Sequence, residues 1–169
     1  MNLKIIFLLI TLTCSIFVNS EISLSHLNNE LKKNYSFVER SLNQTDLEIN
    51  SSSGEIFFDK DGISVKILSP FEEIYRIEDN TLQIYDVFLD QTQIIDLKII
   101  DNLFLNILVQ GVDENSDQYQ VKFLDSSSIE IFPKEANKPI KFLFLKEKLK
   151  RIHFIDSIGI EHGIELNEI

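Results

Sequence analysis

The feature that most constrains the fold is a series of four short apolar segments between Gly54 and Gln91, with turn residues between them. The segments are rich in Ile, Phe, Tyr and Val, the residue types that fit a pleated sheet. Strands joined by short turns pair antiparallel with their neighbours in the sequence. The pattern therefore predicts an antiparallel meander of EIFF, ISVKIL, EIYRI and TLQIY, with turns at Lys60-Asp61-Gly62, Ser69-Pro70 and Glu78-Asp79-Asn80.

Apolar segments of the same kind continue through the second half of the chain. They cover 94–100, 119–124, 128–132, 140–145, 149–155 and, as a possible last strand, 163–169. Asn50 to Ser53 is expected to be a turn. A sheet of about nine or ten strands with one apolar face must curl to bury that face. We therefore expect a mainly β fold, an incomplete (open) antiparallel β-barrel or half-barrel covered by helices.

Two segments have helical rather than strand periodicity. The first is Glu21 to Arg40, where three leucines form a narrow apolar stripe. Residues 37–42 either extend this helix or begin the first strand. The second segment is 101–108, with Asp101 as its N-cap and Gly111 at its end. The apolar residues of the two helices are Leu24, Leu27, Leu31, Leu103, Phe104, Ile107 and Leu108.

The first twenty residues have the pattern of a cleaved signal peptide. Lys4 supplies the positive charge, an apolar run follows to Val18, and small residues precede Glu21. The run is shorter than the ~20 residues that span a bilayer, which disfavours the alternative of a membrane anchor. The expected mature chain is one domain, 21–169. Cys14 is the only cysteine; lipid attachment there is the second alternative, although the preceding Thr11-Leu12-Thr13 is a poor match to such sites.

The charge and the missing motifs exclude several classes of function. The chain has 16 basic and 27 acidic residues, a net charge of −11, which repels nucleic acid and anionic lipid surfaces. His26, His153 and His162 lie far apart without metal-ligand spacing, and we expect His26 and His162 to be solvated. Nucleophile-elbow, phosphate-loop and dinucleotide motifs are absent. We therefore expect neither an enzyme nor a metal or cofactor site.

The order of turns and strands resembles the family of periplasmic carriers of outer-membrane lipoproteins (LolA-like). The resemblance covers most of Leu24 to Ile169 and consists of shared spacing rather than one signature. In the first half it is carried by Leu42, Gln44, Gly54, Pro70, Asp79-Asn80, Thr81-Leu82, Tyr85 and Asp90-Gln91. In the second half it is carried by Pro133-Lys134, Ile140, Phe142, Leu149, Ile152, Asp156 and Gly159.

The resemblance implies a carrier that works in the periplasm. Such carriers receive triacylated lipoproteins from an inner-membrane ABC transporter, hold the acyl chains in the barrel, and pass them to an outer-membrane receptor lipoprotein. Exposing one ~16-carbon chain to water costs on the order of 10 kcal/mol, so transport needs an apolar pocket. We expect a monomer with acylated lipoproteins as cargo. The alternative is a non-transporting protein of the same shape, either an outer-membrane receptor lipoprotein or an envelope-stress sensor.

Side-chain alternation along the first strands proposes the wall of that pocket. The expected wall residues are Ile56, Phe58, Ile63, Val65, Ile67, Tyr75, Ile77, Leu82 and Ile84. The seven apolar residues of the two helices would form the lid. A sealed core built from the same residues is the alternative that the sequence leaves open.

Lys60 occupies the place where the resembled family keeps an arginine that holds the lid shut. Asp61 follows it in place of the family's proline, and Ile63-Ser64-Val65 replaces an aromatic–x–Trp pair. The resemblance implies a latch at Lys60, weaker than with arginine because lysine lacks the forked donors. The alternative is a solvated turn residue. The carriers usually continue through another strand and a Pro-containing tail, whereas this sequence ends at Ile169.

Overall fold

One curved antiparallel sheet of eleven strands forms most of the described part of the computed structural model. The model describes residues 22–60, 62–100, 102–134 and 138–169, so the expected signal peptide, Cys14 and the Asp101 cap lie outside the described residues. The strands are β1 (Tyr35–Asn43), β2 (Glu48–Phe58), β3 (Ile63–Ser69), β4 (Glu73–Glu78), β5 (Thr81–Asp86), β6 (Gln91–Asp96), β7 (Tyr119–Asp125), β8 (Ser128–Pro133), β9 (Ile140–Leu145), β10 (Lys148–Ile155) and β11 (Ile160–Glu168).

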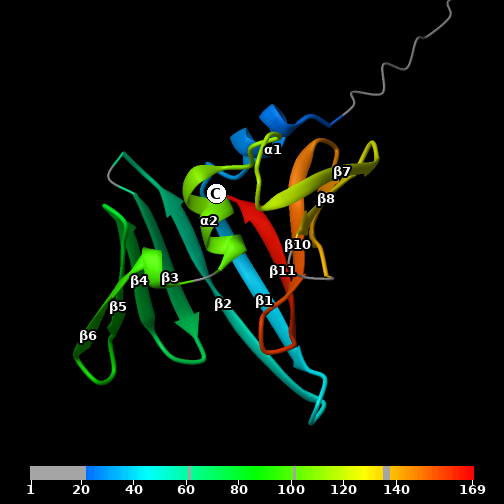
Figure 1. Ribbon diagram of the computed structural model, residues 1–169. Helices are drawn as coiled ribbons and strands as arrows, with labels where there is room; N and C mark the ends of the chain where they lie inside the picture. Colours follow the sequence, from blue (N-terminus) through cyan, green and yellow to red (C-terminus); the bar gives the residue numbers. More distant parts are fainter. Residues whose placement is uncertain (1–21, 61, 101, 135–137) are drawn as a thin grey trace, which may run out of the picture.

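The order of the strands explains why a helix crosses the open face. The order is β6-β5-β4-β3-β2-β1-β11-β10-β9-β8-β7, so two meanders meet where β1 pairs with β11. β6 and β7 lie at opposite edges, and the chain between them must cross from one edge to the other. That connection contains the 3-10 turn Leu97–Ile99 and helix α2 (Leu103–Gln110), which lies between the two halves of the sheet (Figure 1). The expected open half-barrel with helices is confirmed.

Helix α1 (Leu24–Glu30) is much shorter than the helix expected over Glu21 to Arg40. Its N-cap is Ser23, whose side chain accepts a hydrogen bond from the His26 N–H, and β1 starts at Tyr35. Tyr35 and Phe37 alternate with outward residues and are buried, which favours a strand over continued helix. Residues 37–42 therefore belong to the first strand.

The turn expected at Asn50 to Ser53 is wrong, because these polar residues lie within β2 and pair with β1. The turn lies earlier, at residues 44–47, where Leu47 has a φ of 60°. Asn43 and Asp46 stabilise it by accepting hydrogen bonds from the N–H groups of Thr45 and Glu48. Asparagine and serine favour turns locally, whereas strand pairing over the whole of β1 decides the outcome here.

At Gly54 the backbones of β2 and β3 approach closely. The register of the two strands shifts between Ser53 and Gly54, and a Cβ added at Gly54 would lie 2.0 Å from the Lys66 carbonyl oxygen. Only glycine can occupy such a site without moving the neighbouring strand.

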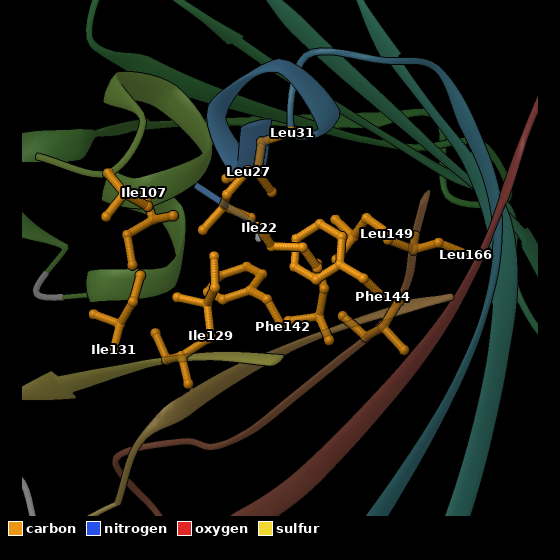
Figure 2. Close-up of a cluster of buried hydrophobic side chains, with 14 of the residues drawn as sticks. Ile22, Leu27, Leu31, Ile107, Ile129, Ile131, Phe142, Phe144, Leu149 and Leu166 are labelled. Atoms are coloured by element: carbon orange, nitrogen blue, oxygen red, sulfur yellow. The ribbon is translucent and has the colours of Figure 1, made fainter. Parts of the chain in front are cut away.

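Two clusters of buried side chains support the sheet. The larger one packs α1 and α2 against β8 to β11, and Figure 2 shows Ile107 of α2 next to Ile131 and Leu27 of α1 near Phe142. The smaller one consists of Ile63, Ile77 and Leu82 with partly buried neighbours. No helix in the described part of the chain combines the length and apolar character that crossing a membrane requires.

Candidate functional site

A cavity of about 510 Å³ lies between the concave face of the sheet and α2. Ile56, Val65 and Leu108 pack against both buried clusters, so the cavity lies where the two clusters meet. Most lining side chains are apolar and many are only partly buried, unlike those of a sealed core. The cavity is lined by Leu31, Tyr35, Phe37, Glu39, Ile56, Phe58, Val65, Ile67, Tyr75, Ile77, Leu82, Asn102, Phe104, Leu105, Leu108, Leu149, Ile152, Phe154, Asp156, His162, Ile164 and Leu166.

Most of the wall residues expected from the sequence lie around this cavity. Ile63 is buried in the smaller cluster instead, and Ile84 packs against that cluster, so neither contributes to the lining. The expected residues that do line the cavity are Ile56, Phe58, Val65, Ile67, Tyr75, Ile77 and Leu82. The alternation along β2 to β5 places them on the concave face.

The residues expected in the lid divide between the cavity and the core. Leu31, Phe104 and Leu108 line the cavity, as does Leu105, which the sequence did not single out. Leu27 and Ile107 are fully buried in the larger cluster, and Leu24 and Leu103 pack against it. The core residues hold the two helices in place, while the lining residues face the cavity.

One side of the wall was missed by sequence reasoning. It consists of β1, β10 and β11, which contribute the apolar residues Tyr35, Phe37, Leu149, Ile152, Phe154, Ile164 and Leu166. Nothing local indicates that β1 pairs with β11, because the partners lie at opposite ends of the described chain. The alternation of side chains along 149–155 was the available signal. Without the pairing of β1 with β11, it does not show which of these side chains face the cavity.

The cavity has one polar end, built from Glu39, Asp156 and His162. The Nδ1 atom of His162 lies 2.6 Å from Glu39 Oε1, and its Nε2 atom lies 3.3 Å from Asp156 Oδ2. The side chain of His162 is only 19% exposed. The expectation that His162 is solvated is therefore wrong: the strand pairing places Glu39 beside it, and the turn after β10 places Asp156 on its other side.

The two carboxylates favour the protonated form of His162. The hydrogen bond with Glu39 raises the pKa of His162 above its ordinary 6.5, although burial opposes this. The same bond lowers the pKa of Glu39. Burial alone would raise the pKa of Asp156, but hydrogen bonds from the Ile160 N–H and His162 bring it below its ordinary value. With His162 protonated, the three groups carry a net charge of −1.

A column of rings connects this polar end with α2. Phe154 stacks on His162 with ring centroids 4.7 Å apart, and Phe104 of α2 stacks on Phe154, also at 4.7 Å. The position of the helix is thus coupled by direct contact to the ring that titrates.

The side chain of Asn28 in α1 is hydrogen-bonded to the segment that follows α2. Asn28 donates from Nδ2 to the Val112 carbonyl at 2.9 Å and accepts from the Val112 N–H at 2.7 Å. Gly111, at the helix end, has a φ of 80°. At the other end, Asn102 caps the helix by accepting from the Leu105 N–H.

Lys60 lies exposed in the turn between β2 and β3. Within the described residues, no hydrogen bond or ion pair joins its side chain to α2. The latch expected from the resemblance is therefore not formed in this structure, because an ammonium group in contact with water needs no acceptor from the helix. Among the same residues, no group of His, Cys, Asp and Glu side chains is arranged to hold a metal ion.

No protein-family model matches the sequence, and a search of curated proteins finds no match. Similar solved structures include an uncharacterized conserved protein from Thermus thermophilus, with 11% identity and a TM-score of 0.48 over 86% of this chain and 85% of that chain. A putative outer membrane lipoprotein-sorting protein domain from Vibrio parahaemolyticus has 9% identity and a TM-score of 0.42, covering 86% and 90%. A DUF1329 family protein from Desulfovibrio piger has 13% identity and a TM-score of 0.39, over 85% of this chain and 88% of that chain. All three TM-scores lie below 0.5, so these likenesses do not indicate a function.

Proposed function

We propose that this protein is a carrier that binds the acyl chains of lipoproteins in the cavity under α2 and moves them through the periplasm. The observation that carries the proposal is the cavity itself: about 510 Å³, mostly apolar, and lined by partly buried side chains of β2, β3 and α2. This volume falls within the roughly 300–1,000 Å³ typical of small-molecule sites. Partly exposed apolar walls gain free energy when a hydrocarbon chain covers them.

The attachment of α2 is compatible with opening and closing. Only Ile107 of the helix is fully buried, and two hydrogen bonds from Asn28 hold the segment that follows it. A helix with one fully buried residue can separate from the cavity wall without unfolding the sheet. A carrier needs this property, because a permanently closed apolar pocket would retain its cargo.

The remaining steps of the proposal concern location and partners. The mature protein, starting at Glu21, would be a soluble periplasmic monomer. It would receive acylated lipoproteins from an inner-membrane ABC transporter and pass them to an outer-membrane receptor lipoprotein. The strong net negative charge supports a protein that approaches anionic membranes only through such partners.

Two neighbouring positions on β3 test the binding site. Ile67 lines the cavity, whereas the adjacent Leu68 is exposed and faces the other way. Ile67→Glu places a carboxylate in the apolar wall and should weaken the binding of an apolar fluorescent probe at least about tenfold. Leu68→Glu adds the same charge outside and should bind the probe as the wild type does. Equal binding by both variants and the wild type would place the probe elsewhere and overturn the proposal.

A further inference from the structure

The polar groups along the cavity wall are unevenly divided between donors and acceptors. Tyr35 donates its hydroxyl to the Glu30 carbonyl at 3.0 Å, and Tyr75 donates to the Glu73 carboxylate, so both donors are engaged. Both ring nitrogens of His162 are also engaged. Among the described polar side chains that line the cavity, the amide Nδ2 of Asn102 is the donor that remains, since its Oδ1 caps α2.

Acceptors, by contrast, remain available at the polar end. A carboxylate offers about four acceptor positions. Glu39 uses one oxygen for His162 and the other for the Ser52 hydroxyl at 2.9 Å. Asp156 accepts from the Ile158 and Ile160 N–H groups and from His162. Each carboxylate therefore keeps acceptor capacity, and both are about three-quarters buried, with side chains 26% and 24% exposed.

The charges at the polar end of the cavity also favour a positively charged ligand. The groups that face His162 are Glu39 from β1, Asp156 from the turn after β10, and the ring of Phe154; the hydroxyl of Ser52 from β2 lies behind Glu39. Two carboxylates beside one imidazole leave a net charge of −1 when His162 is protonated and −2 when it is neutral. Because these groups are partly removed from water, salt screens them less than it screens surface charges.

We propose that the cavity selects amphiphiles with a cationic head group, in the simplest case a primary ammonium, and seats that head beside Glu39 and Asp156 with the chain along the apolar wall. This inference rests on the proposed function and narrows its cargo to acylated lipoproteins with a free N-terminal ammonium, because the amide nitrogen of a triacylated N-terminus carries no charge. An ammonium group brings three donors and a positive charge, which the polar end can accept. A carboxylate head would instead meet two carboxylates and few donors.

Three amphiphiles with the same chain test the proposal: dodecylammonium, dodecanol and dodecanoate, each used to displace an apolar fluorescent probe at pH 7. We expect the ammonium to bind at least about tenfold more tightly than the carboxylate, as expected for one partly screened charge pair, with the alcohol between them. Glu39→Gln keeps the shape of the side chain and should reduce that ratio severalfold. Asp156→Asn, which keeps the acceptor for the backbone N–H groups, should act in the same direction.

A control is needed because an acidic protein attracts any cation. Glu48→Gln removes one charge from an exposed end of β2, away from the cavity, and should leave the ratio unchanged. If the three amphiphiles bind equally, or if Glu39→Gln and Asp156→Asn, shown to be folded by their unfolding curves, keep the full preference, the head-group inference is overturned while the apolar site stands. If none of the three displaces the probe, the proposed function itself fails.

Discussion

The imidazole of His162 lies nearly parallel to the ring of Phe154, at an angle of 12° with centroids 4.7 Å apart, while its two nitrogens bind Glu39 and Asp156. Phe104 of α2 stacks on the ring of Phe154. The charged end of the cavity and the helix that covers it are therefore parts of one packed unit. A change in the protonation of His162 should alter both the stability of the sheet and the seating of the helix.

The raised pKa of His162 predicts how stability depends on pH. Protonated His162 stabilises the folded state, so this contribution is fully present below the unfolded-state pKa, near 6.5, and is lost as pH rises through the folded-state pKa. We expect a loss of about 1 to 2 kcal/mol, the scale of a charge-assisted hydrogen bond. Urea unfolding measured across this range should show the loss in the wild type and not in His162→Gln.

His153→Gln is the matched control for this measurement. His153 pairs with Glu161 and lines a groove on the other face of the sheet, away from the cavity. Its replacement should leave the alkaline loss of stability unchanged. If His162→Gln keeps the same loss as the wild type, the imidazole between the two carboxylates is not its source.

A second loss of stability is expected at acid pH, where the carboxylates become protonated. Glu39 has a folded-state pKa below its ordinary 4.5, so the stability it contributes is present above that value and disappears as pH falls through the folded-state pKa. In the same urea unfolding series, the stability of Glu39→Gln should fall less steeply than that of the wild type as the pH is lowered. A fall identical to that of the wild type would contradict the assignment.

Asn28 is predicted to hold the lid. Asn28→Ala removes both hydrogen bonds to Val112, which should cost about 1 to 2 kcal/mol of local stability and speed hydrogen exchange at the Val112 amide. Probe association should become faster as the helix opens more often. Asn29→Ala, at the exposed neighbouring position on α1, should behave as the wild type.

Lys60→Leu distinguishes this attachment from the latch that the resemblance implied. Because Lys60 is exposed, its replacement should leave probe association as in the wild type if α2 is held as the structure shows. A faster association in Lys60→Leu with no change in Asn28→Ala would assign the latch to Lys60 instead.

Gly54 and Gly163 form a pair of glycine-to-alanine tests within the sheet. The added Cβ at Gly54 would lie 2.0 Å from the Lys66 carbonyl oxygen, whereas at Gly163 the nearest atom, the Arg40 carbonyl oxygen, is 3.8 Å away. Gly54→Ala should destabilise the protein by roughly 2 to 4 kcal/mol because two strands must separate. Gly163→Ala should cost little. Similar unfolding midpoints for the two variants would contradict the close approach of β2 and β3.

The sequence predicted local features well and long-range pairings poorly. The strands from Gly54 to Gln91 and their inward residues follow from alternation and turn chemistry, and the structure has them in antiparallel register. The pairing of β1 with β11 joins residues more than a hundred positions apart, such as Glu39 and Ile164, and no local pattern encodes it. Consequently half of the cavity wall, and the contact between His162 and Glu39, could be found only in the folded structure.

The most direct test of the carrier proposal is to locate a bound chain by photocrosslinking. A fatty acyl chain with a diazirine near its terminus should label Ile56, Val65 and Leu108, where the two buried clusters meet at the cavity. Phe71 and Phe88, which are 73% and 86% exposed, serve as internal controls for non-specific contact with apolar surface. The account predicts label at the cavity residues and its loss in Ile67→Glu; label confined to Phe71 and Phe88, or unaffected by Ile67→Glu, would contradict it.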